Sequence, residues 1–276
     1  MKGRGSRFSH REGFTLIEVL VSVAVLALLS VLLLRLVTDT QSASRPALRQ
    51  MGATAQAQVA LDRLALDWAA LVARPDVPCQ LADAGTNAIA LDFFTRVPTS
   101  GSGRKISRVS YQMATGLSPG LKRASKEADW GAAFMGESAG GVAMTFSDLP
   151  VGLQLAASDY DLLAPGTLRM AVRFLRRDTG GVTQNPPTKN GTVDFDQLAG
   201  VLVTLVTLDD QTVKPLTAAE RQSLSAAFPD VPDGTLPLSS WEAISSNPGN
   251  FPNDIPQSTT SSLRVFQRFF PLPQPQ

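Results

Sequence analysis

The chain opens with an apolar run that contrasts with everything after it. From Phe14 to Val37 the sequence reads FTLIEVLVSVAVLALLSVLLLRLV. At a rise of ~1.5 Å per residue, a helix of this length reaches ~36 Å, enough to cross a hydrocarbon core of ~30 Å. The pattern therefore predicts a membrane-spanning helix over residues 14–37, preceded by a short basic leader over residues 1–13.

Residues 38–75 are predicted to continue this helix beyond the membrane. Good helix formers predominate from 47 to 73, although Pro46 is expected to interrupt the helix and Gly52 to weaken it. An apolar stripe recurs there at helical spacing, formed by Leu61, Leu64, Trp68 and Leu71. We expect this stripe to pack onto a globular head.

From residue 76 onward the hydrophobic period changes to two, which is typical of β-strands. Strands are expected at 88–95, 106–113, 121–125, 142–146, 151–155, 167–176, 198–208 and 263–270. In the sixth of these strands, apolar positions alternate with two arginines; the positions are Leu168, Met170, Val172 and Phe174 against Arg169 and Arg173. The predicted fold class is therefore α+β, with a long N-terminal helix packed on a mainly antiparallel β-sheet head over residues 76–276.

Two long segments of the head, 178–197 and 229–262, are rich in Gly, Pro, Asn, Ser and Thr and are predicted to be loops. Two T/S-x-x-E patterns predict helix starts by the capping-box rule. Thr217-x-x-Glu220 predicts a helix to about Phe228, and Ser239-x-x-Glu242 predicts one short helical piece inside the second loop.

A single carboxylate, Glu18, lies inside the apolar run. A charge at the centre of a membrane helix costs about 2.5–3.5 kcal/mol, and less near the helix end. A simple anchor needs no such residue, so we interpret Glu18 as an assembly residue rather than a catalyst. Four basic residues of the leader favour a cytoplasmic N-terminus, namely Lys2, Arg4, Arg7 and Arg11.

The stretch from Gly13 to Val21, G-F-T-L-I-E-V-L-V, resembles the type III signal of type IV pilins and of the pseudopilins of type II secretion. The resemblance implies that a prepilin peptidase cuts between Gly13 and Phe14 and methylates the new amine of Phe14. Glu18 would then be neutralised by the Phe14 amine of an adjacent subunit. It also implies helix packing with other pilin subunits, and a single pass through the inner (cytoplasmic) membrane with the head periplasmic or exoplasmic.

The head adds a second, broader resemblance. The segments LDRLALDWAALVARPD, LDFF and RKISRVSYQM are similar to J-type minor pseudopilins, in which a sheet wraps on the helix. The chain also resembles the pseudopilin-like Verru_Chthon cassette protein C family. Both resemblances imply a structural subunit and not an enzyme.

Composition narrows the chemistry further. The only histidine is His10, in the leader, so a chain cut after Gly13 has no histidine for a catalytic triad or a zinc site. Cys79 is the only cysteine, and we interpret it as a small part-buried residue. Removal of residues 1–13 leaves 21 basic and 23 acidic residues, with no basic cluster of the kind that binds nucleic acid.

No cofactor is expected except, as a candidate, calcium. Asp159 with Asp161, and Asp209 with Asp210, are acidic pairs that offer oxygen ligands, but neither pair has the graded spacing of an EF-hand.

The sequence thus predicts a minor pseudopilin or pilin-like subunit that assembles through its N-terminal helix into a type II secretion or type IV pilus-like filament. The alternative is a single-pass, membrane-anchored exoplasmic binding protein or enzyme unrelated to filaments.

Overall fold

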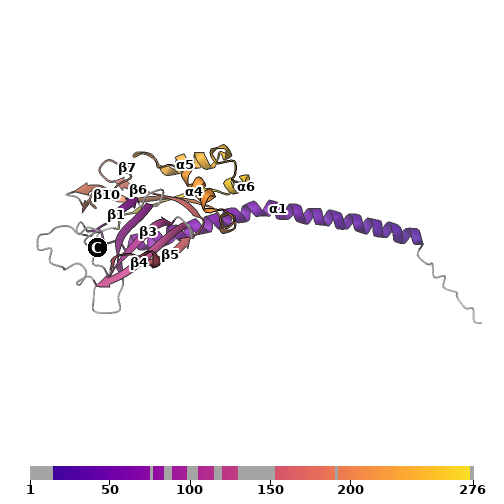
Figure 1. The fold of residues 1–276 in the computed structure, drawn as a ribbon, viewed down its shortest axis with the longest axis horizontal. Coiled ribbons are helices and arrows are strands. Elements are labelled where there is room, and N and C mark those ends of the chain that lie inside the picture. The colour runs from indigo at the N-terminus through magenta and orange to yellow at the C-terminus, as the bar shows by residue number, and fades with distance from the viewer. Residues whose placement is uncertain are drawn as a thin grey trace, which may run out of the picture. The chain divides into compact units, whose positions relative to one another are not determined.

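The computed structural model describes residues 15–74, 77–83, 89–97, 105–114, 120–129, 153–189 and 192–273. The chain forms two compact units, Met1–Ala47 and Leu48–Gln276. The first described element is the long helix α1, Leu16–Ala69, which contributes to both units (Figure 1). The predicted cleavage point at Gly13 and Phe14 lies outside the described residues, as do the expected strand at 142–146 and Trp130.

The predicted interruption at Pro46 is wrong, because α1 is helical through that position. A proline inside a helix removes one backbone hydrogen bond, which the flanking turns can tolerate. The helix also ends earlier than residue 73. Leu71 forms a bridge to Thr95, and the Val72 N–H donates to the Phe94 carbonyl at 2.8 Å, so pairing with a strand ends the helix before residue 75.

The head contains a five-stranded antiparallel sheet, sheet A, with the order β1-β2-β3-β4-β5. Its strands are β1 (Gln80–Asp83), β2 (Ile89–Val97), β3 (Lys105–Ala114), β4 (Gly120–Asp129) and β5 (Tyr160–Ala164). The predicted hairpin is confirmed as β2 and β3, and the predicted third strand as β4. The described part of 151–155 contains no strand; the short 3-10 helix η3 (Ala157–Asp159) follows it and leads into β5.

Sheet B has the order β11-β10-β6-β7. Its strands are β6 (Thr167–Arg176), β7 (Val182–Thr183), β10 (Leu198–Thr207) and β11 (Arg264–Pro271), which confirms the three long strands expected from the sequence. A small ribbon of β8 (Thr188–Lys189) and β9 (Thr192–Val193) lies within the segment predicted as a loop.

Short helices follow β10. They are α3 (Asp210–Val213), α4 (Ala218–Ala226), α5 (Pro237–Ser245), η4 (Pro248–Asn250) and α6 (Gln257–Thr260). The capping box at Thr217 is confirmed for α4. The second capping box is wrong, because α5 starts earlier, with Leu236 at the N-cap and Pro237 as its first residue. The 229–262 segment therefore holds more helix than the single piece expected.

Two hydrophobic cores hold α1, the two sheets and the short helices together as layers. The first joins the end of α1, from Ala60 onward, and Leu71 after it to one face of each sheet, through residues such as Leu64, Trp68, Phe93 and Val172. The second lies between sheet B and the short helices and is centred on Trp241. Figure 1 shows α4, α5 and α6 on one side of the head and β3, β4 and β5 on the other.

Because the helical layer covers it, β6 is buried along both faces over its first eight residues. Its alternation departs from expectation at Leu168, which packs in the second core rather than beside Met170. The register with β10 shifts between Val206 and Thr207, opposite this position, and such a bulge turns one side chain to the other face.

Candidate assembly site on the N-terminal helix

The apolar part of α1 is exposed on all sides. Leu16–Thr40 is a 25-residue segment with a mean hydropathy of 2.8 and none of its apolar window buried, which makes it long and apolar enough to cross a membrane. Large apolar side chains occur at almost every position in it, from Leu16, 81% exposed, to Val37, 50% exposed. A helix that is apolar all round requires an apolar surrounding, either lipid or other helices.

Glu18 closes a capping box at the start of this helix. Its Oε2 accepts hydrogen bonds from the Thr15 N–H and from Thr15 Oγ1, each at 2.9 Å, and Thr15 Oγ1 accepts the Glu18 N–H at 3.3 Å. Both groups are thus satisfied near the positive end of the helix dipole, where a carboxylate is favoured. Sequence reasoning missed this role of Thr15, although the T-x-x-E pattern was available.

Only one oxygen of Glu18 is used in this way. No described residue donates to Oε1, because both hydrogen bonds that the carboxylate accepts end on Oε2. The predicted partner, a Phe14 amine from an adjacent subunit, lies outside the described residues. The pairing of Glu18 with that amine therefore stays a prediction, with Oε1 as the atom that can accept it.

The hydroxyl side chains that follow along the apolar segment bond to the helix backbone. Ser22 Oγ donates to the Glu18 carbonyl at 2.7 Å, and Ser30 Oγ donates to the Leu26 carbonyl at 2.8 Å. Thr38 and Thr40 likewise donate to backbone carbonyls four residues earlier in the helix. Such bonds satisfy hydroxyl groups where no water is present. Glu18 is different, because part of its carboxylate remains available to a partner.

The second half of α1 carries an apolar stripe that the head does not cover. It consists of Leu48, Met51, Val59 and Leu66, which are between 55% and 68% exposed. These positions recur on one side of the helix, while Ala53, Ala57, Ala60 and Leu64 on the opposite side are buried in the head. We call these four residues the outer stripe.

The first calcium candidate pair consists of Asp159 on η3 and Asp161 on β5, and Asp159 is already engaged by the chain. Asp159 Oδ2 accepts the Ala156 N–H at 2.8 Å and lies 3.5 Å from Lys126 Nζ. The backbone hydrogen bond, reinforced by the lysine, lowers the pKa of Asp159 below its usual value. Asp161 lies on β5, opposite Arg123 in the strand register.

The other candidate pair starts a helix. Asp209, only 4% exposed, caps α3 by accepting the N–H groups of Gln211 and Thr212, and Asp210 pairs with Lys214 at 2.5 Å. Among the described residues no three His, Cys, Asp or Glu side chains gather as a metal site would require. Calcium binding by either pair stays a prediction, tested by the melting temperature with and without calcium.

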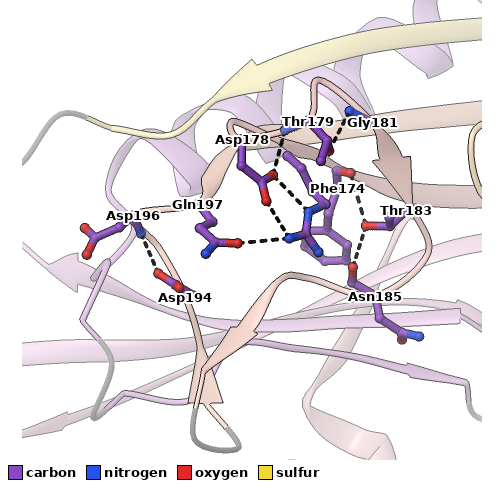
Figure 2. Close-up of polar contacts among 10 residues, drawn as sticks. Phe174, Asp178, Thr179, Gly181, Thr183, Asn185, Asp194, Asp196 and Gln197 are labelled. Atoms are coloured by element: carbon purple, nitrogen blue, oxygen red, sulfur yellow. Dashed lines mark hydrogen bonds and ion pairs between the residues drawn. The ribbon is translucent and has the colours of Figure 1, made fainter.

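Two acidic residues of 178–197, Asp178 and Asp194, accept hydrogen bonds from their neighbours, as Figure 2 shows. Asp178 is bound side-on by Arg176, at 3.0 Å from Nε and 2.7 Å from Nη2, which lowers the pKa of Asp178 to about 2. Asp194 accepts the N–H of Asp196 at 3.1 Å, and Gln197 accepts from Arg176 at 2.9 Å.

Trp68 and Trp241 are packing residues. Trp68 is 1% exposed and donates to the Pro271 carbonyl at 3.0 Å, and Trp241 is fully buried and donates to the Pro229 carbonyl at 3.0 Å. Trp241 lies in the 229–262 segment that the sequence predicted to be a loop, and the helix α5 turns it inward. Cys79 is also buried, and burial raises the pKa of its thiol to about 12.

Comparison with known proteins supports the N-terminal interpretation. Residues 8–34 match the family model of the prokaryotic N-terminal methylation motif. A type IV-like pilin from Thermus thermophilus superposes with a TM-score of 0.36 and 10% identity, over 79% of this chain and 93% of that chain. No curated protein sequence matches the chain significantly. The chain thus carries a prokaryotic N-terminal methylation motif at the start of an apolar helix that is long enough to cross a membrane.

Proposed function

We infer that this chain is a minor pseudopilin or pilin-like subunit, a structural protein that assembles through α1 into a type II secretion or type IV pilus-like filament. The observation that carries the proposal is the exposed apolar helix with Glu18 at its start. One carboxylate oxygen is held by Thr15 and the other has no described donor. A lone charge in that position stabilises an assembly only if a partner supplies the opposite charge.

The outer stripe supports the same proposal from a separate part of the chain. Four large apolar side chains along the exposed side of a helix form a surface that suits packing against another helix. A monomeric anchored enzyme has no need of such a stripe on the helix that supports its head.

The remaining parts of the proposal follow from the methylation motif. A prepilin peptidase cuts between Gly13 and Phe14 and methylates Phe14, the leader stays cytoplasmic, and the head lies on the periplasmic or exoplasmic side of the inner membrane. The helical layer of 210–260 makes the head large, which suits a tip or initiating position better than the repeating body of a filament.

Replacement of Glu18 tests the assembly role directly. We expect Glu18→Val to be inserted in the membrane normally but to be lost from sheared filaments, because the helix then offers no charge to the incoming amine. Ser22→Ala is the matched control, since it removes a polar group one turn away that bonds only to the Glu18 carbonyl. Normal incorporation of Glu18→Val would contradict the proposal.

Intact mass separates the proposal from the alternative of a single-pass anchored binding protein or enzyme. A chain purified from cells that contain the peptidase should lack residues 1–13 and carry one methyl group at its new amine. A full-length, unmethylated mass from such cells would favour the simple anchor.

A further inference from the structure

Two arginines of β6 are buried beneath the segment that links α4 to α5. Arg169 is 1% exposed and Arg173 is 2% exposed, and both side chains leave sheet B on the side of the helical layer. In the sequence the two arginines alternate with the apolar positions of the strand. Their burial therefore requires partners that the alternating pattern did not predict.

The guanidinium groups converge on two consecutive residues. Arg169 Nη2 lies 2.7 Å from Asp230 Oδ1, and Arg173 Nη2 donates to the Val231 carbonyl at 2.6 Å. On the strand the two arginines are four residues apart, which is about 13 Å, whereas neighbouring residues such as 230 and 231 are about 3.8 Å apart. The two guanidinium groups therefore contact adjacent residues of the same segment, on the side of β6 that Ala171 also faces.

These contacts leave several donors unused. Arg169 Nε and Nη1 and Arg173 Nε are buried and have no hydrogen-bond partner among the described residues. A buried donor without an acceptor is costly, and most such groups in folded proteins are bound by a water or an ion. The unused donors come from both guanidinium groups, whereas Arg173 Nη1 donates to the Val172 carbonyl at 3.0 Å.

The local charge is also unbalanced. Asp230 is the one carboxylate that contacts either arginine in the described part of the chain, and it is 56% exposed, so water weakens its effect. Asp233 is nearby, but its Oδ1 accepts the Gln184 N–H at 2.7 Å. Burial lowers the pKa of Arg173 below its usual value. Two guanidinium groups remain with one direct, partly hydrated counter-charge.

We propose that Arg169 and Arg173, beneath the 230–231 segment, form a binding site for a small oxyanion of the phosphate or sulfate kind. Guanidinium N–H groups donate charge-assisted hydrogen bonds to such anions, and the anion supplies both the missing acceptors and the missing negative charge. The bound anion ties the segment between α4 and α5 to sheet B and so stabilises the helical layer.

Thermal unfolding of the full chain in detergent micelles tests the site, with inorganic phosphate as the probe and sodium chloride at matched ionic strength and pH as the reference. We expect phosphate to raise the melting temperature saturably, by about 2–4 °C at concentrations well above the dissociation constant. Arg173→Met should lose this response. Arg176→Gln is the matched control, because Arg176 lies on the same strand but is bound to Asp178 and Gln197 instead.

A second variant decides the matter if Arg173→Met does not fold. Asp230→Asn removes the carboxylate that competes with the anion at an exposed position, so it should lower the phosphate concentration that gives half the effect. Phosphate also stabilises proteins in general, but that effect rises without saturating. A non-saturating rise shared by all variants, or an unchanged half-effect concentration in Asp230→Asn, would overturn the proposal and leave water as the partner of these donors.

Discussion

The hydroxyl of Tyr111 donates a 2.5 Å hydrogen bond to Oδ2 of Asp67, the same carboxylate that Arg123 binds side-on from β4 at 2.6 and 3.1 Å. Arg63, one turn back on α1, lies 3.3 Å from the other oxygen. One carboxylate of α1 therefore joins the helix to two neighbouring strands of sheet A. Because Asp67 is only 7% exposed, this ion pair is weakly screened by water.

Replacement of Asp67 by Asn should destabilise the head by about 3 kcal/mol, because it leaves Arg123 partly buried without its counter-charge. Tyr111→Phe removes only one hydrogen bond and should cost about 1–2 kcal/mol. Denaturation midpoints of the full chain in detergent measure both. Asp62→Asn is the control: its partner is Arg268, the pair is 46% and 66% exposed, and the change should be under about 1 kcal/mol. Equal effects of the two Asp→Asn changes would contradict this account.

Two leucines that lie two residues apart allow the roles of the outer stripe and of the buried side of α1 to be tested separately. Leu64 is 2% exposed and Leu66 is 67% exposed. Leu64→Ala should destabilise the head by about 2–5 kcal/mol. Leu66→Ser should change its stability by no more than about 0.5 kcal/mol, yet lower the amount of the chain recovered in filaments. Unfolding curves and filament pull-downs on the same preparations give both quantities, and full incorporation of Leu66→Ser would show that the stripe is not an assembly surface.

Cys79 should not react in the folded chain. Its thiol is buried and its pKa is raised to about 12, mainly by burial and secondarily by Asp92. The thiolate is the reactive form, so a thiol reagent at pH 8 should modify Cys79 only after unfolding.

The raised pKa of Cys79 also changes the stability of the head at high pH. The unfolded thiol ionises above about pH 9 while the folded thiol keeps its proton, so stability falls as the pH rises from there toward 12. Cys79→Ala should reduce that fall.

Much of this fold is readable from the sequence because the determining interactions are local. The apolar run, the period-two strands and the Thr217 cap each depend on residues within a few positions of one another, and each has its expected structure. Glu18 also stands out locally, because a carboxylate is costly in an apolar helix.

The features that the sequence did not predict depend on distant residues. The burial of Arg169 and Arg173 is such a feature, because a layer built from residues some 40 to 90 positions later covers them. Leu168 changes core because a bulge against β10 shifts its register, and no alternation pattern shows a bulge. Ser239 resembled an N-cap, yet Pro237 already fixes the first residue of α5, and Ser239 Oγ donates to the Leu236 carbonyl instead.

A close backbone approach fixes where α1 meets the turn between β5 and β6. The Gly166 N–H donates to Gln56 Oε1 at 2.6 Å, and a Cβ on residue 166 would lie 2.1 Å from the Leu208 carbonyl oxygen. Gly166→Ala must push backbone atoms apart and should cost about 1–3 kcal/mol. Gly180→Ala is an imperfect comparison because of its positive φ of 66°, although nothing lies within 4 Å of its Cβ position. If Gly166→Ala lowers the stability of the head less than Gly180→Ala does, the turn between β5 and β6 moves freely.

The two candidate caps in the helical layer make a matched pair for the last prediction. Thr217 Oγ1 accepts the Glu220 N–H at 3.2 Å, and Glu220 Oε2 accepts the Thr217 N–H at 2.6 Å, whereas Ser239 caps nothing. Thr217→Ala should destabilise the head by about 1 kcal/mol, and Ser239→Ala by less than half of that. The Thr217 hydrogen bonds lower the pKa of Glu220, so the contribution of the box is complete above the ordinary glutamate pKa and is lost as the pH falls through the lowered value. Urea midpoints of both variants and of the unaltered chain, taken from pH 7 down to pH 3, should therefore show the Thr217→Ala difference shrinking with acid. A difference that stays constant across that range would show that the hydroxyl, and not the carboxylate, supplies the whole effect.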